Sequence, residues 1–176
     1  MNEPGSEPVT TGPDVTVERE TLEERLKQEQ KFEAGARWFH WLAGLSIINS
    51  IIVVAGGSWS FLFGLGITQI VTGAAVGLGE ERPDLAVTAK IVGLLINLVV
   101  AGMFVLFGFL ARRRKLWVFA VGMAIYVADA AIFVWVKDWL GLAFHVWVLM
   151  ALYGGAKMCH QLNQQREAER GAVEAA

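Results

Sequence analysis

Two ionisable side chains lie deep inside long apolar segments, and their types and spacing could do chemistry. Asp129 comes about eight residues before the pair Lys137-Asp138, and His145 comes about eight residues after Lys137. In an antiparallel helical hairpin, equal offsets from the turn give equal depth, here on the order of 10 Å by helix rise. A lone charge at that depth costs roughly 2.5 to 3.5 kcal/mol on insertion scales, so we expect Asp129 and His145 to form a hydrogen-bonded pair.

Such a pair has three chemical interpretations. A carboxylate in contact with an imidazole could relay protons through the membrane. His145 could instead ligate a haem iron or a chlorophyll magnesium while Asp129 orients its other nitrogen. The third interpretation, which we favour, is a structural clasp that locks two helices together. No cofactor is predicted unless the second interpretation holds.

The elements that must position this pair are long and apolar. Hydrophobic residues make up 55% of the 176-residue chain, and a soluble domain of this size could not bury nearly all of them and stay dissolved. Five apolar segments of roughly 19 to 24 residues follow one another, the length that a helix needs to cross the hydrocarbon core of a bilayer. The fold class is therefore an all-α polytopic transmembrane helical bundle of five apolar helices, four or five of them spanning. The segments are residues 38–56, 60–78, 88–111, 116–136 and 139–158.

The composition divides the chain into four parts. Residues 1–20 are rich in proline and acidic residues, which predicts a disordered acidic N-terminal tail. A charged juxtamembrane helix is expected over residues 21–36, starting with a capping box at Thr21. Residues 37–158 form the transmembrane helical domain, and residues 159–176 form a polar cytoplasmic C-terminal tail.

The distribution of basic residues predicts the orientation. By the positive-inside rule one basic run marks a cytoplasmic loop, which also puts the C-terminus in the cytoplasm and the acidic loop near residue 80 outside. If segment 60–78 spans, the N-terminal tail is outside; if the segment is re-entrant, the tail is cytoplasmic and obeys the rule. The charge bias favours the re-entrant alternative. The residues of the basic run are Arg112, Arg113, Arg114 and Lys115.

Three apolar segments each carry one strong neutral polar group, at Asn49, Gln69 and Asn97. We expect these side chains to form interhelical hydrogen bonds, which are worth only about 0.6 to 2 kcal/mol each in membranes. The alternative is a polar pathway in which all three face one axis together with Asp129 and His145.

Small residues at four-residue spacing predict close helix packing. The pattern does not determine whether the partner helix belongs to the same chain or to another subunit. The positions are Gly73 and Gly77 in the second segment and Ala120, Ala124 and Ala128 in the fourth.

Composition also excludes several classes of protein. The formal net charge of -2 gives no basic field for binding nucleic acid. The single cysteine, Cys159, cannot form an intrachain disulfide or a multi-cysteine metal site. No phosphate-binding loop, zinc-protease motif or hydrolase motif is present, so the chain is expected to be non-enzymatic with no metal. The N-terminus lacks the pattern of a cleavable signal peptide.

Two blocks of the sequence carry a resemblance. The first block is FEAGARWFHWLAGLSIINS at residues 32–50, followed by WSF at 59–61 and GLGITQ at 64–69. The second block is DWL at residues 138–140 with FH at 144–145. They resemble uncharacterised small bacterial multi-pass integral membrane proteins of unknown function. The resemblance covers most of residues 32–156. It implies a bacterial membrane protein and implies no activity, cofactor or catalytic residue.

These observations favour a non-enzymatic integral membrane protein of the bacterial cytoplasmic membrane, an accessory or structural component of a larger membrane complex. Its expected partners are the lipid bilayer and other membrane subunits or copies of itself. Small size, small-residue stripes and charged ends carry this interpretation. The alternatives are a small proton- or ion-coupled transporter or channel using Asp129 and His145, and a haem- or chlorophyll-binding subunit with His145 as ligand.

Overall fold

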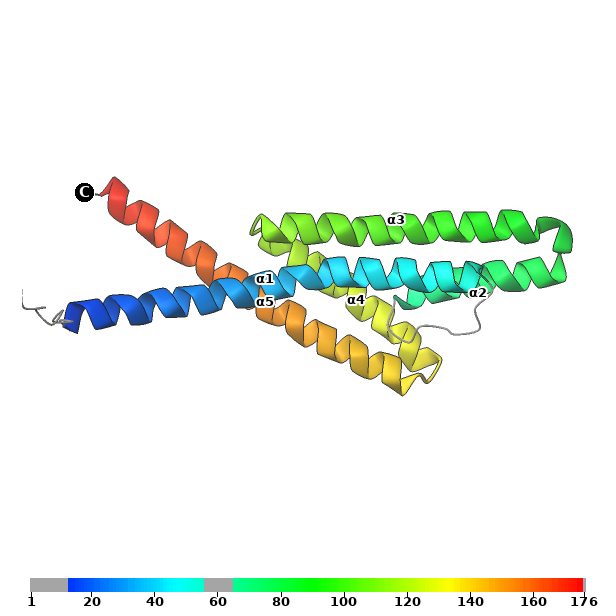
Figure 1. Ribbon diagram of the computed structural model, residues 1–176, viewed down its shortest axis with the longest axis horizontal. Helices are drawn as coiled ribbons and strands as arrows, with labels where there is room; N and C mark the ends of the chain where they lie inside the picture. Colours follow the sequence, from blue (N-terminus) through cyan, green and yellow to red (C-terminus); the bar gives the residue numbers. More distant parts are fainter. Residues whose placement is uncertain (1–12, 56–64, 176) are drawn as a thin grey trace, which may run out of the picture.

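Helices form nearly all of the chain that the structure, a computed structural model, describes, namely residues 13–55 and 65–175 (Figure 1). No strand occurs within these two ranges, so the prediction of an all-helical fold is confirmed. The elements are α1 (Pro13–Val54), α2 (Gly66–Glu81), the short 3-10 helix η1 (Pro83–Leu85), α3 (Ala86–Arg112), α4 (Leu116–Trp135) and α5 (Trp139–Glu174).

Three stretches of helix are long and apolar enough to cross a membrane: Pro83–Arg112, Leu116–Trp135 and Trp139–Glu174. They contain the last three of the predicted apolar segments. Helix α2 has 16 residues, about 24 Å by helix rise, which is short of a full crossing. The first residues of the predicted segment 60–78, up to residue 64, lie outside the described ranges.

Helix α1 is one continuous helix of 42 residues where the sequence predicted a disordered tail, a charged helix and an apolar helix. It begins at Pro13, so residues 13–20 are helical. Thr21 lies inside the helix, where its Oγ1 donates a hydrogen bond to the Glu18 carbonyl at 2.8 Å. The predicted capping box at Thr21 is therefore wrong, because a proline at the first helical position starts the helix two turns earlier. The first twelve residues of the predicted tail lie outside the described ranges.

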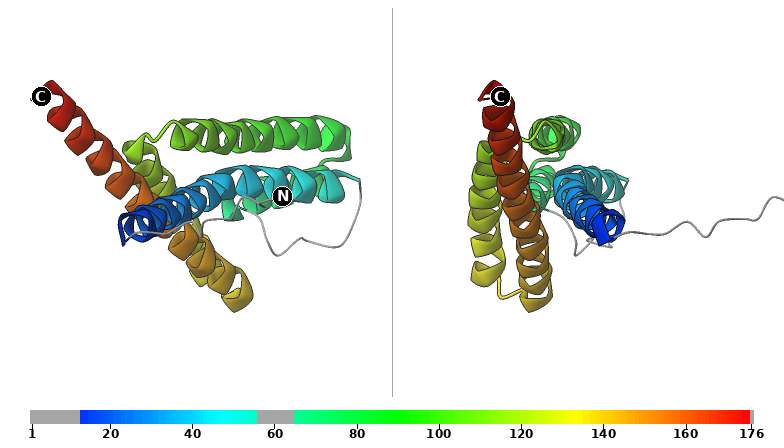
Figure 2. Two further views of the ribbon diagram at one scale, coloured as in Figure 1. Left: turned by 60° about the vertical axis from the view of Figure 1, so that its left-hand side comes forward. Right: turned by 90° about the vertical axis from the view of Figure 1, so that its left-hand side faces the viewer.

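Helices α1, α2 and α3 lie side by side, and the hairpin of α4 and α5 crosses them obliquely (Figure 1 and Figure 2). Helix α1 packs against α3 and α5, while α2 packs against α3 and α4 packs against α5. Helices α1 and α2 run in the same direction, and α3 returns beside them. The backbone N–H of Leu65 donates to Ser46 Oγ at 3.3 Å, so α2 begins beside the middle of the apolar half of α1.

The closest helix crossing is between α1 and α5, at Gly35 and Gly155. A Cβ added to Gly35 would lie 2.5 Å from the Cα of Gly155, so neither helix tolerates a side chain there. In contrast, a Cβ added to Gly73 or Gly77 meets nothing within 4 Å. Of the two alternatives that the sequence leaves open, close contact within the chain is not made by these two glycines, and packing against another subunit stays a prediction. The alanines of the predicted stripe are likewise exposed, at Ala120, Ala124 and Ala128.

The charged ends of α1 and α5 lie at the same end of the molecule as the α3–α4 turn. Arg25 on α1 forms an ion pair of 2.6 Å with Glu169 on α5. Arg114 in the α3–α4 turn pairs with Glu29 on α1, and its carbonyl accepts a hydrogen bond of 3.1 Å from Asn163 Nδ2 on α5. The basic run and the two ends of the described chain are thus brought to one side.

Candidate functional site

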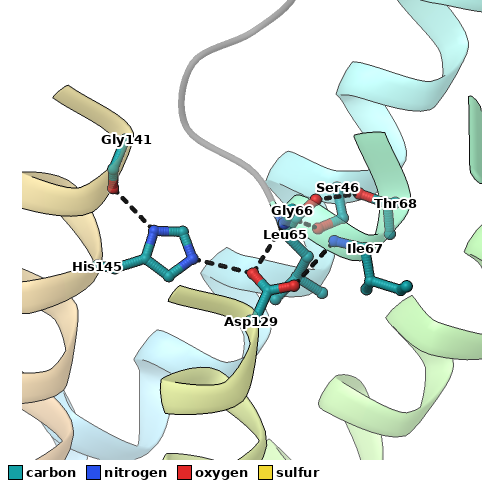
Figure 3. Close-up of polar contacts among 8 residues, drawn as sticks. All are labelled: Ser46, Leu65, Gly66, Ile67, Thr68, Asp129, Gly141 and His145. Carbon is teal, nitrogen blue, oxygen red and sulfur yellow. Dashed lines mark hydrogen bonds and ion pairs between the residues drawn. The ribbon is translucent and has the colours of Figure 1, made fainter. Parts of the chain in front are cut away.

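Asp129 on α4 caps the start of α2 (Figure 3). Its Oδ2 accepts a hydrogen bond of 2.7 Å from the backbone N–H of Gly66, and its Oδ1 accepts one of 2.8 Å from that of Ile67. The first N–H groups of a helix have no acceptor within the helix and form the positive end of its dipole. A carboxylate from a distant part of the chain supplies both acceptors here.

The sequence of α4 explains why Asp129 points inward. Buried residues recur at helical spacing along one face of α4, at Gly122, Tyr126, Asp129 and Phe133. The exposed alanine stripe lies on other faces of the same helix. The carboxylate therefore faces the interior of the helical bundle, where a charge needs partners.

His145 on α5 completes the site. Its side chain is 0% exposed, and its Nε2 lies 2.9 Å from Asp129 Oδ2. Its Nδ1 lies 2.8 Å from the carbonyl oxygen of Gly141, one turn earlier on α5. The structure thus brings together the two residues that the hairpin argument paired.

The hydrogen-bond partners indicate which atoms of this pair donate and which accept. The Gly141 carbonyl can only accept, so Nδ1 of His145 carries a hydrogen and donates it. Both oxygens of Asp129 accept hydrogen bonds from backbone donors at the positive end of α2, which is a favourable position for a carboxylate. Nε2 of His145 lies within hydrogen-bond distance of Oδ2, so the two side chains form a hydrogen-bonded carboxyl–imidazole pair.

Aromatic rings enclose the imidazole. The ring of Tyr126 stacks on His145 with centroids 4.3 Å apart and planes at 12°, and the ring of Phe133 lies 4.4 Å away. This stacking fixes the plane of the imidazole against α4. The Phe133 ring has room in this position because two of its neighbours are glycines. A Cβ added to Gly141 would lie 2.3 Å from the ring, and a Cβ added to Gly66 would lie 2.8 Å from it.

A second polar centre lies further along α2. Nδ2 of Asn97 on α3 donates to Ser50 Oγ on α1 at 2.9 Å and to Thr72 Oγ1 on α2 at 2.7 Å. Ser50 Oγ in turn donates to the Ser46 carbonyl at 2.9 Å. We call this group the neutral cluster; its members are Ser46, Ser50, Thr68, Thr72 and Asn97, all buried.

The predicted polar residues fall into separate places. Asn97 lies in the neutral cluster, and Asn49 is buried on α1. Nε2 of Gln69 has no hydrogen-bond partner. Asp129 and His145 form their own pair, which meets the neutral cluster only through the backbone of the first turn of α2. Asn97 on the one hand and Asp129 with His145 on the other therefore belong to separate hydrogen-bonded groups.

Sequence reasoning missed the residues that complete both centres. Ser46 and Ser50 are four residues apart on α1, and Thr68 and Thr72 are four residues apart on α2. That spacing places each pair on one helix face, which was an available signal. No comparable signal links Asp129 with the backbone of Gly66, because the contact joins positions 63 residues apart.

The described residues offer no metal site made of three or more histidine, cysteine, aspartate or glutamate side chains. His145 also has both ring nitrogens engaged in hydrogen bonds. An iron or magnesium ion could bind Nε2 only after the contact with Asp129 was broken. The arrangement is thus suited to holding three helices together.

Comparison with protein-family models, curated proteins and solved structures finds no match to this chain. Inference about function therefore rests on the geometry of the site.

Proposed function

We propose that this chain is a non-enzymatic integral membrane protein, an accessory or structural component of a larger membrane complex, in which Asp129 and His145 form a structural clasp. One observation carries the proposal. Both oxygens of Asp129 and both ring nitrogens of His145 have partners within the chain. Binding of a ligand or metal at either side chain would need one of these atoms to be vacated, and a proton path would need a further titratable group beyond the pair.

The transport alternative has less support from the contacts around the pair. A proton relay uses side chains or water molecules that take up and release protons in turn. Beyond Asp129 and His145, the hydrogen bonds lead to the backbone N–H groups of Gly66 and Ile67 and to the carbonyl of Gly141. Backbone amides hold their protons, so the path stops at the pair on both sides.

The haem or chlorophyll alternative also has less support. An axial ligand needs a free nitrogen beside a space that can hold a large flat ring. Nε2 of His145 instead faces Asp129, and Tyr126 and Phe133 pack on the imidazole.

The proposed topology has four membrane crossings, with α2 as a re-entrant helix. Helices α1 and α2 run in the same direction, and a re-entrant α2 leaves both ends of the chain on the side of the basic run. The positive-inside rule would make that side cytoplasmic, in a bacterial inner membrane. The cap from Asp129 supports this proposal, because a helix that starts inside the membrane needs acceptors for its first N–H groups.

Membership of a complex is supported by the charged helical extensions. Helix α5 continues to Glu174, well beyond the residue 158 at which its apolar segment ends. The N-terminal half of α1 lies beside it, joined by the ion pair of Arg25 and Glu169. These extensions reach into the aqueous phase and offer a surface to other subunits or to a second copy.

Proton flux and absorption test the clasp against its alternatives. In proteoliposomes loaded with a pH-sensitive dye, we expect wild-type protein to pass no more protons than Asp129→Asn or empty vesicles. We also expect no Soret or chlorin band in the purified protein. A flux that Asp129→Asn abolishes, or such a band lost in His145→Phe, would contradict the clasp.

Particle mass tests membership of a complex. The chain has a mass of 19.3 kDa, so after extraction with its native lipids we expect particles that hold further protein in a fixed ratio. Particles containing only one copy of this chain would contradict that part of the proposal.

A further inference from the structure

The α3–α4 turn separates its four basic residues into two kinds. Arg114 has a left-handed backbone with φ of 58°, and its guanidinium turns inward to pair with Glu29. Its carbonyl accepts from Asn163. One basic residue is therefore used to fix the turn against α1 and α5.

The other three basic residues of the turn are Arg112, Arg113 and Lys115. All three are exposed, and no acidic side chain within the described ranges forms an ion pair with them. The turn thus presents three positive charges within four residues that no acidic side chain of the described ranges neutralises.

Apolar aromatic groups lie next to these charges. The guanidinium carbon of Arg113 lies 4.4 Å above the ring of Phe109, one turn back on α3. Phe109 is 51% exposed, and Trp117, two residues after Lys115, is 55% exposed. Tryptophan next to basic residues at the end of an apolar helix is typical of the level of lipid headgroups.

We propose that this turn binds the headgroups of anionic phospholipids. The phosphate of such a lipid would lie among Arg112, Arg113 and Lys115, with its acyl chains beside Phe109 and Trp117. Juxtamembrane clusters of basic residues attract anionic lipid, and the exposed aromatic rings favour a lipid over a free phosphate ion. The site is independent of the Asp129–His145 pair.

Native mass spectrometry of the full-length protein tests this. The protein is mixed in detergent with equal amounts of phosphatidylglycerol and phosphatidylcholine. Each basic residue near the surface contributes on the order of fivefold to anionic lipid binding, so we expect phosphatidylglycerol to be retained at least about tenfold over phosphatidylcholine. The preference should fall at high salt, because screening shortens the range of the charges.

The variant R112Q/R113Q/K115Q should lose this preference. The matched control K27Q/R166Q/R170Q removes three exposed charges from the extensions at the same end and should keep it. Equal retention of both lipids by the wild type, or an equal loss in the two variants, would overturn the proposal. Displacement of phosphatidylglycerol by inorganic phosphate would also overturn it, by assigning the site to a free ion.

Discussion

The Asp129–His145 pair and the neutral cluster around Asn97 both hold the first half of α2, with different chemistry. In the pair, every polar side-chain atom has a partner, and two of those partners are backbone N–H groups. In the neutral cluster, Oδ1 of Asn97 is left without a partner. The difference follows from charge, because an unpaired ion in the membrane costs far more than an unpaired amide oxygen.

The two centres also connect different helices. The pair joins α4 and α5 to the start of α2, and the neutral cluster joins α1 and α3 to its next turn. Helix α2 is too short to span the membrane, so its position depends on its contacts with the Asp129–His145 pair and with the neutral cluster. If charge decides the relative strength of the two centres, loss of the pair should lower the free energy of unfolding more than loss of the neutral cluster.

The largest expected effect is that of Asp129→Ala. It leaves His145 charged or unpaired and removes both acceptors from the start of α2, and breaking a buried ion pair costs about 3 to 5 kcal/mol. Unfolding of the purified protein by denaturant in detergent, followed by circular dichroism, measures the loss. Asp84→Ala, which breaks only the exposed ion pair with Arg82, is the matched control and should change stability by less than about 1 kcal/mol. Equal effects of the two changes would contradict the claim that the buried Asp129–His145 pair dominates stability.

His145→Phe should have the next largest effect. Phenylalanine can keep the stack on Tyr126 but loses both hydrogen bonds, and a hydrogen bond to a charged group contributes about 1.5 to 3 kcal/mol. The double variant with Asp129→Asn should recover part of the loss, since it removes the charge that His145 neutralises. Losses that simply add would mean that the two residues act independently.

Gly141→Ala tests the packing on which the pair depends. The new Cβ would come within 2.3 Å of the Phe133 ring and 2.7 Å of Asp138 Oδ2, and overpacking of this kind costs about 1 to 3 kcal/mol. Gly73→Ala on α2 is the control, because its Cβ meets nothing within 4 Å. A stability change at Gly73 as large as that at Gly141 would show that the outer face of α2 is covered.

Asn97→Leu should have the smallest effect of the four. It keeps the number and branching of the side-chain heavy atoms and removes the hydrogen bonds to Ser50 and Thr72, which are worth about 0.6 to 2 kcal/mol in membranes. The same unfolding measurement detects it, with Thr72→Val as a companion of similar or smaller effect. A loss that matches Asp129→Ala would make the neutral cluster the main support of α2.

Local signals in the sequence indicated most of the helices. Residue 116 begins both the predicted segment and α4, and residue 139 begins both the last segment and α5, because apolar length and the charged turns between helices are local features. The contact between Asp129 and His145 could be predicted because the two residues are equally far in sequence from the turn between α4 and α5. That argument needs only helix rise, which does not depend on the rest of the chain.

The remainder depended on long-range packing. Periodicity assigned close contacts to Gly73 and Gly77, but the crossing is made by Gly35 and Gly155, which are far apart in sequence. The start of α1 was placed at Thr21 because the capping pattern there is locally plausible, although the helix begins at Pro13. Gly66 and Ile67 could not be assigned to the site, since their contribution is through backbone N–H groups that every residue type other than proline carries.

The most direct test of the account is the distance between the Asp129 carboxyl carbon and the backbone nitrogens that it caps. Solid-state NMR of protein in lipid bilayers, with ¹³C in aspartate carboxyls and ¹⁵N in glycine and isoleucine, measures it by dipolar dephasing. The hydrogen bonds of 2.7 and 2.8 Å to Gly66 and Ile67 predict carbon–nitrogen distances of about 4 Å or less. The dephasing by isoleucine ¹⁵N should disappear in Asp129→Ala, whereas part of the dephasing by glycine ¹⁵N should persist because Asp138 Oδ1 accepts from the N–H of Gly141 at 3.0 Å. Absence of the isoleucine dephasing in the wild type would contradict the central claim that Asp129 anchors the start of α2.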